Sequence, residues 1–340
     1  MIRFIFRRLI SGLVVLFLFQ TAVFFLVQLT LPGDFVSHLQ LVPDQAKELR
    51  THLGLDRPLW ERYLIYLSNL LRGDFGRSFA FFKVGVPISQ VLMETIPATL
   101  LVFGSGTAIA FLIGQWLGRV IAWRGPGLLS SSVTFSAITL YTSFPPWLAF
   151  LLIFIMFDRS GLSQPSLDRL MWHTAPRTTS EVMSIMVATL LLGILILICL
   201  NLLLKRLTKR SLPILLFLAL LLAFWAWSWK VVGIFPYALD IAQVAFIPLL
   251  AYVLLSFGEI TLIMRTTMMD AMHEEFVHTA RAKGLLDRDV RDKHVARNAL
   301  LPVVSGLVIR MPYLLTGAVM IEYSLDWEGI GSAGSESGSR

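Results

Sequence analysis

The chain has 340 residues, of which 56% are hydrophobic and 15% are charged, with a formal net charge of +7. A composition this apolar excludes a large soluble domain and indicates an all-α protein that crosses a membrane several times. The only cysteine, Cys199, lies in an apolar run, which excludes a disulfide framework and a thiolate metal cluster.

The N-terminal region predicts one membrane helix followed by an external element. Three arginines in the first eight residues precede 25 charge-free residues at 9–33, and a bilayer core needs only about 20. This run is too long for the core of a cleaved signal peptide, so 1–33 is interpreted as a span. Residues 34–94 contain no run long enough to cross, but the leucine and aromatic face of 58–72 predicts an amphipathic helix.

Six further apolar runs predict six more spans, seven in all. They cover residues 95–118, 128–157, 182–204, 211–229, 241–264 and 302–323. The third span contains Pro145 and Pro146, which must break or kink its helix. Its serine and threonine residues either line a polar path or allow close helix packing.

The basic residues gather on one side of the predicted spans. Nine Lys or Arg and no Asp or Glu occur in three short connections, 1–8, 119–124 and 205–210. The opposite connections, 158–181 and 230–240, are balanced in charge. By the positive-inside rule, the N-terminus and the charged segment 265–302 then lie in the cytoplasm. The basic run at 205–210 either contacts anionic membrane lipid or simply sets the topology, and no nucleic-acid partner is expected.

The segment between the last two spans is a charged island. Residues 274–283 predict a short helix that ends at Gly284, because glycine tolerates a left-handed helix cap. Asp287 is a good N-cap for a second helix that leads to Pro302. The apolar pair at 285–286 lies at the corner between the two helices, where it would contact a cytoplasmic partner.

Two motifs in this island carry a family resemblance. The text TARAKG at 279–284 and the text RNALLP at 297–302 closely resemble the ATPase-coupling loop, or EAA loop, of ABC importer permeases. The nearest variant is that of the oligopeptide, dipeptide and nickel group, which the external text at 53–79 also resembles. The strict Glu-Ala-Ala start is absent, because His278-Thr279-Ala280 stands there. The resemblance covers residues 1–157 and 241–331.

The resemblance implies the fold and the domain organisation. The fold would be the type I ABC importer transmembrane fold, with an extra helical hairpin at 182–229 and with the last family span missing, as in a truncated gene or a fragment. The expected parts are an N-terminal transmembrane helix (1–33), an external segment (34–94), transmembrane helices 2 and 3 (95–157), an external loop with the inserted hairpin (158–240), the permease core (241–323) with its coupling loop (265–302), and a tail (324–340).

The resemblance also implies the function and the partners. The chain would be a transport subunit without enzyme activity or cofactor, forming half of the pathway for peptides or similar small solutes in a bacterial or archaeal cytoplasmic membrane. It would work with a second homologous permease, two ATP-binding subunits and an extracytoplasmic solute-binding protein. The residues implied in ATPase coupling are Ala280, Arg281, Lys283, Gly284, Leu285, Leu286 and Asp287.

Two lone charges inside apolar spans predict a second site. Glu259 lies six residues before Arg265, and Arg310 lies eight residues after Pro302. These spacings put the two charges at similar depths, roughly 9 Å and roughly 12 Å from the same membrane face. A charge at such a depth usually faces a partner or water. We therefore expect an ion pair between Glu259 and Arg310. In the alternative, Arg310 reaches the interface and Glu259 caps a local polar group.

The sequence holds no convincing catalytic or metal motif. The pattern His273-Glu274 followed by His278 resembles a zinc-protease motif, but the second histidine is one residue late, so the two face different sides of a helix. No phosphate-binding glycine loop is present, so ATP would have to bind to another chain. The alternative functions are a stand-alone carrier or intramembrane enzyme that uses the lone charges, or an inactive truncated permease.

Overall fold

In the computed structural model of the chain, the described residues are 2–30, 47, 50–51, 56–78, 85–159, 167, 172–173, 175–208 and 213–332. Within these ranges the protein consists of helices, with a single β-bridge between Arg77 and Pro87 and no β-strand. The chain divides into two compact units, Met1–Gly76 and Arg77–Arg340. The all-α class predicted from the sequence is confirmed.

The first unit contains α1 (Ile2–Thr30) and α3 (Leu59–Leu71). The ring of Phe24 stacks on Tyr66 with centroids 5.1 Å apart, and the hydroxyl groups of Thr21 and Tyr63 lie 2.8 Å apart. The predicted amphipathic helix is therefore present as α3, and its tyrosines pack on the first span. Much of the expected external segment 34–94 lies outside the described residues.

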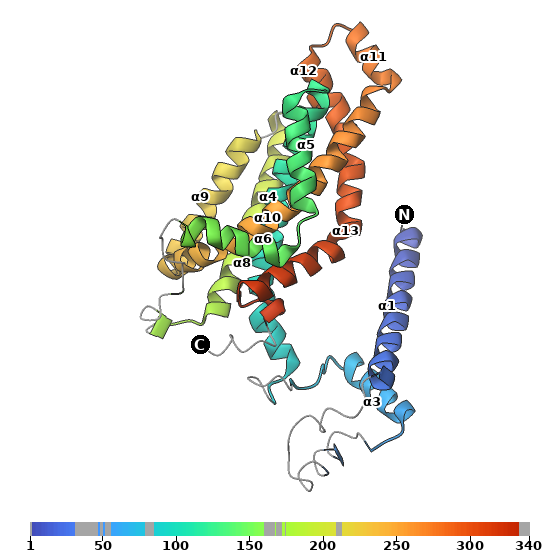
Figure 1. The fold of residues 1–340 in the computed structure, drawn as a ribbon, viewed down its shortest axis with the longest axis vertical. Helices are drawn as coiled ribbons and strands as arrows, with labels where there is room; N and C mark the ends of the chain where they lie inside the picture. Colours follow the sequence, from blue (N-terminus) through green and yellow to red (C-terminus); the bar gives the residue numbers. More distant parts are fainter. Residues whose placement is uncertain are drawn as a thin grey trace. The chain divides into compact units, whose positions relative to one another are not determined.

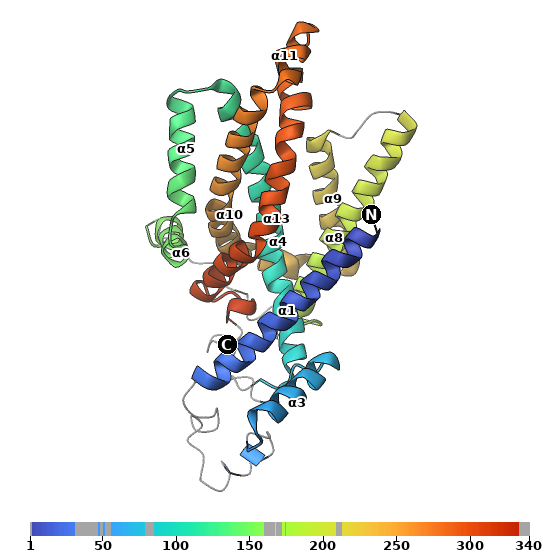
Figure 2. The same cartoon turned by 90° about the vertical axis from the view of Figure 1, so that its right-hand side faces the viewer.

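The second unit is a helical bundle in which the long helices run along one direction (Figure 1). Its helices are α4 (Ile88–Arg124), α5 (Leu128–Tyr141), α6 (Pro145–Ile153), the π-helix η2 (Phe154–Asp158), α8 (Thr179–Thr208), α9 (Ile214–Val232), α10 (Phe235–Met272), α11 (Glu275–Ala282), α12 (Asp287–Asp289), the π-helix η3 (Val290–Val295), α13 (Ala296–Ser324) and the 3-10 helix η4 (Ile330–Ser332). In Figure 2, α4, α10 and α13 form the middle of this unit, with α5 and α6 on one side and α8 and α9 on the other.

The core of the second unit forms two hydrophobic clusters, one toward each end of the long helices. The α6-end cluster joins Val102 of α4, Tyr252 of α10 and Ile321 of α13. The α11-end cluster joins Met268 of α10 and Val303 of α13 to the residues of α11. Because α4, α10 and α13 contribute to both clusters, these three helices form the frame that positions both ends of the bundle.

Small residues allow α4 and α10 to approach closely. Gly106, Ala110, Gly114 and Gly118 recur every four residues and therefore lie on one face of α4. A Cβ atom added at Gly114 would lie 2.8 Å from Cβ of Ile260, which is closer than real Cβ contacts. Small residues at such spacing are typical of helix pairs packed inside membranes.

The third predicted span is broken sharply at its two prolines. Helix α5 and the pair α6–η2 meet at 107°. Pro145 and Pro146 lie in the first turn of α6. Backbone N–H groups of the first turn have no partner within the helix, so the missing N–H of proline costs no hydrogen bond there, and its fixed φ suits the helix start. The prolines therefore begin a new helix in a new direction.

Most of the predicted spans are present as helices long enough to cross a membrane. In the described residues, five helices have the required length and hydropathy, or six if α5 and α6–η2 count as one span. The predicted span 211–229 corresponds to α9, a helix of 19 residues. Its described apolar part, Leu216–Val232, is counted among the shorter apolar helices. A bilayer core needs about 20 residues of helix, with a range that includes the length of α9, so the seventh span stays a prediction.

Candidate functional site

The charged island forms the α11 end of the second unit (Figure 1). Helix α11 ends at Ala282, Lys283 is its C-cap residue, and Gly284 follows with a φ of +73°. Side chains with a Cβ atom disfavour this left-handed conformation, so the backbone itself requires glycine here. The turn predicted at Gly284 is thus present.

Residues 275–302 of the charged island, named the coupling segment after their expected role, are anchored in the α11-end cluster by their inner face. Val277 of α11 and Val290 and Val295 of η3 are fully buried, and Ala280 is 6% exposed. These side chains pack in the same cluster as Met264 and Met268 of α10. Burial of this many apolar groups fixes the segment on the end of the bundle.

The outer face of the coupling segment is exposed. Leu285 is 39% exposed and Leu286 is 72% exposed, although both are apolar. Of the seven residues expected to take part in ATPase coupling, Ala280 is buried, and the other six are exposed: Arg281, Lys283, Gly284, Leu285, Leu286 and Asp287. The structure therefore presents an apolar corner on a rigid base, and the coupling role of these residues stays a prediction.

Arg281 connects three parts of this end of the molecule. Its guanidinium group lies 5.7 Å from the ring centroid of Trp123 on α4, and its Nε lies 3.5 Å from Oδ1 of Asp287. Both charged side chains are largely exposed, so this ion pair contributes little, about 0–1 kcal/mol. Asp287 is the first residue of α12 rather than its N-cap, because Leu286 holds the N-cap position without a side-chain hydrogen bond. The prediction that Asp287 caps the helix is wrong by one residue.

The predicted second short helix is part of a much longer one. Residues Asp287–Ser324 run as one helical span through α12, η3 and α13, with Pro302 inside it. The π-helical turn η3 widens the helix between the apolar corner at Leu285 and Leu286, called the coupling corner, and α13. Such π-turns are rare and are often located at functional sites.

Glu259 of α10 and Arg310 of α13 form an ion pair inside the membrane-spanning part. Nη1 of Arg310 contacts Oε1 of Glu259, whose side chain is 6% exposed, whereas that of Arg310 is 48% exposed. A buried carboxylate requires such a partner, because an isolated charge in a low-dielectric interior is costly. The role of this pair in transport stays a prediction.

A third group, which the sequence reasoning missed, surrounds Glu322 near the end of α13. This residue is fully buried, and its Oε2 accepts a hydrogen bond of 3.0 Å from the backbone N–H of Gly331. Trp327 Nε1 donates to the carbonyl oxygen of Ala98 at 3.1 Å, and the N–H of Ile330 donates to Oγ1 of Thr99 at 2.9 Å. We call residues 327–332 the C-terminal clasp. An acidic residue at the end of an apolar run, followed by Gly-x-Gly, was the available signal.

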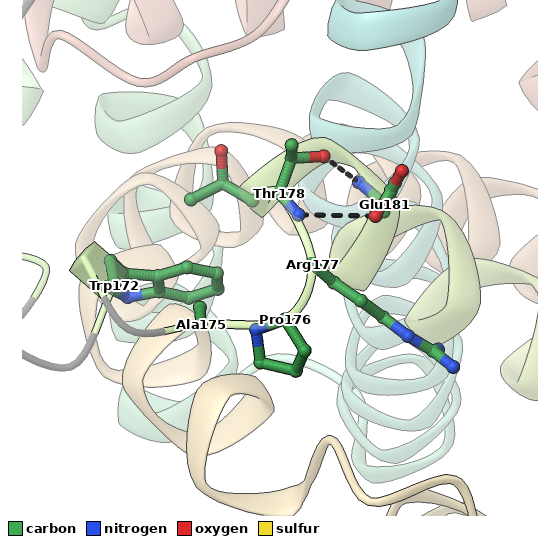
Figure 3. A pocket seen from close by; sticks show the side chains of 7 residues that line it. Trp172, Ala175, Pro176, Arg177, Thr178 and Glu181 are labelled. Carbon is green, nitrogen blue, oxygen red and sulfur yellow. Dashed lines mark hydrogen bonds between the residues drawn. The ribbon is translucent and has the colours of Figure 1, made fainter.

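A shallow pocket lies beside the start of α8. It has a volume of about 400 Å³ and is lined by Trp172, Ala175, Pro176, Arg177, Thr178, Thr179 and Glu181 (Figure 3). Thr178 and Glu181 form a capping box, in which the N–H of Thr178 donates to Glu181 Oε2 at 3.2 Å and the N–H of Glu181 donates to Thr178 Oγ1 at 3.3 Å. These two side chains therefore serve the start of the helix. Within the described ranges, no group of three or more His, Cys, Asp or Glu could hold a metal ion.

Comparisons with known proteins agree with this architecture. A family model described as "Binding-protein-dependent transport system inner membrane component" matches residues 207–340, and the model of its N-terminal part matches residues 1–101. A putative peptide permease protein of Brucella suis is 30% identical over 339 residues, which cover 97% of this chain and 85% of that protein. The dipeptide transport system permease protein of Lactococcus lactis is 26% identical over 98% of this chain and 85% of its own length. The corresponding Escherichia coli K12 protein is 26% identical over 97% and 86%.

These matches confirm the family predicted from the coupling-loop motifs. The chain is a multi-pass membrane protein with the type I ABC importer fold, and it is a non-catalytic transport subunit. Neither a stand-alone carrier nor an intramembrane enzyme receives support from them. The chain belongs to the binding-protein-dependent transport system inner membrane components, and it is a permease subunit of an ABC importer.

Proposed function

We propose that this permease imports peptides, with ATP hydrolysed by separate chains. The substrate class is supported by relatives named as dipeptide and oligopeptide permeases. The proposed transporter contains a second homologous permease, two ATP-binding subunits and an extracytoplasmic solute-binding protein. The charge asymmetry of the connections supports an orientation with the N-terminus and the segment 265–302 in the cytoplasm of a bacterial or archaeal cell.

The coupling segment at 275–302 is the proposed contact with an ATP-binding subunit. The observation that carries this proposal is its two-sided packing, in which Val277 and Val290 are buried while Leu285 and Leu286 are exposed. An apolar pair on a rigid, anchored corner fits an anchor that fills a pocket on a partner. Movement of the partner would then reach α10 and α13, since both helices share a cluster with the segment.

The test introduces a charge into this apolar corner. Leu286→Asp should abolish co-purification of the ATP-binding subunits and ATP-driven uptake of labelled dipeptides, because a carboxylate would be buried in a dry contact. Leu207→Asp on α8 is the matched control, since Leu207 is also 72% exposed and should tolerate the change. Unchanged association of the Leu286 variant would contradict the docking role. Failure of the wild-type transporter to take up any dipeptide would contradict the proposed substrate.

A further inference from the structure

The middle of α13 is exposed on all sides of the helix. All six residues from 308 to 313 are exposed, whereas Val303 before them and Leu314 after them are buried. In an ordinary packed helix, one face would be buried at every turn. This segment therefore borders on something other than the described part of this chain, over more than one full turn.

The segment carries one charged group, the guanidinium of Arg310, whose side chain is 48% exposed. A guanidinium has five N–H donors on three nitrogens, and the structure shows Glu259 as its ionic partner within the described ranges, through Nη1. The N–H groups on Nε and Nη2 are not part of this contact. Two such donors in a planar fork match the two oxygens of a carboxylate.

We infer that Arg310 contacts the terminal carboxylate of a peptide during its passage through the membrane, an inference that rests on the proposed function. A peptide is a zwitterion, so its ammonium group compensates the charge that its carboxylate brings. The Glu259–Arg310 pair can then exchange partners with the peptide without leaving an unpaired charge in a low-dielectric environment. A fixed acidic residue from a neighbouring subunit would instead add one uncompensated negative charge, which favours the substrate as the occupant.

The test compares peptides that differ only in the terminal carboxylate. The complete transporter is reconstituted in vesicles and given an equimolar mixture of dipeptides and their C-terminal amides, and uptake is read by mass spectrometry. The double variant Glu259→Gln/Arg310→Gln removes the fork without stranding a charge, and Arg310→Lys keeps the charge without the fork. The control is Arg265→Gln, which removes a cation of α10 that donates to Thr134 instead.

The expected readout is the ratio of carboxylate to amide uptake. Wild type should favour the free carboxylates by roughly tenfold or more, because a site that hydrogen-bonds a group rejects the analogue that lacks it. The double variant should bring the ratio close to that of no preference, Arg310→Lys should retain part of it, and Arg265→Gln should keep it. The binding protein is the same in every sample, so a ratio that both Arg310 variants leave unchanged would overturn the inference. Equal uptake of acids and amides by wild type would overturn it while leaving the proposed function standing, whereas no uptake of any peptide would contradict the proposed function.

Discussion

Arg310 of α13 and Glu259 of α10 pair a half-exposed cation with a buried anion inside the membrane-spanning part of the bundle. Two contacts at glycines flank the pair. A Cβ atom at Gly306 would lie 3.8 Å from Ile263, and one at Gly317 would lie 3.3 Å from Leu255. Because Leu255, Glu259 and Ile263 follow at intervals of four, they share one face of α10, and the ion pair lies in register between the two contacts.

The asymmetry of this pair predicts unequal effects of the two single substitutions. Arg310→Gln strands the buried carboxylate and should lower the free energy of unfolding by about 3 kcal/mol. Glu259→Gln leaves a half-exposed guanidinium that can reach water or lipid head groups, so we expect a loss of about 1 kcal/mol. Thermal unfolding of the purified variants in detergent measures both.

The charge swap provides the control for this pair. Glu259→Arg combined with Arg310→Glu should recover part of the folded yield lost in the single charge reversals. If the double variant merely shows the sum of the two single losses, the residues are not coupled in the folded protein.

A substitution of Gly284 should uncouple transport without preventing insertion. Its N–H donates to the carbonyl oxygen of Arg281 at 2.9 Å, and its φ is +73°, so Gly284→Pro removes a hydrogen bond and cannot adopt this conformation. We expect ATP-driven uptake to be lost. Gly233→Pro is the matched control, because Gly233 also has a positive φ, of +77°, but lies after α9. Equal loss of ATPase association in both variants would speak against a specific role of the coupling corner.

The close approach of α4 and α10 predicts opposite tolerance at two glycines of one helix. Gly114→Ala would place a methyl group 2.8 Å from Ile260, and overpacking of this kind costs about 1–3 kcal/mol. Gly104→Ala meets nothing within 4 Å and should leave the melting temperature unchanged or raise it. The measurement is the melting temperature of each variant in detergent. Equal values for the two variants would show that α4 and α10 do not pack at Gly114.

The C-terminal clasp depends on the indole N–H of Trp327. Trp327→Phe keeps most of the ring volume but removes the donor to Ala98, so unfolding should become easier by about 1 kcal/mol. Trp227→Phe on α9 is the control, because Trp227 is 62% exposed. A clasp variant as stable as the control would indicate that the hydrogen bond contributes nothing.

The proposed orientation can be tested by cysteine labelling in intact cells. Cysteines at Ser68 and Thr178 should react with a membrane-impermeant reagent from outside, and one at Thr208 should react only after the membrane is opened. The physical reason is the positive-inside bias of the connection 205–210, which contains Thr208. External labelling at position 208 would reverse the whole assignment of sides.

Features that depend on local chemistry were readable from the sequence. The turn at Gly284 follows from the need for a left-handed residue, and the start of α6 follows from two adjacent prolines. The opposition of Glu259 and Arg310 follows from similar depths along two helices that enter from one face. The turn and the helix start depend on a few neighbouring residues, whereas the ion pair depends on counting along two helices that a short segment connects.

Features that depend on contacts between distant segments were not readable. Trp327 donates a hydrogen bond to Ala98, 229 positions away, and the sequence around either residue does not indicate the other. The direction of α6 after its prolines, at 107° to α5, is set by packing on α10 and α13 rather than by the prolines themselves.

Helix α13 is packed at both ends and exposed in the middle. Its first turns are packed in the α11-end cluster, and its last turns are held by the α6-end cluster and the C-terminal clasp. Between these ends, residues 308–313 are exposed and are held by the Arg310–Glu259 ion pair, and Pro312 removes one backbone hydrogen bond. Bending at this hinge costs little, because it breaks no contact in either cluster. A movement that reaches the first turns of α13 would therefore bend the helix at the level of Arg310 and leave its last turns in place.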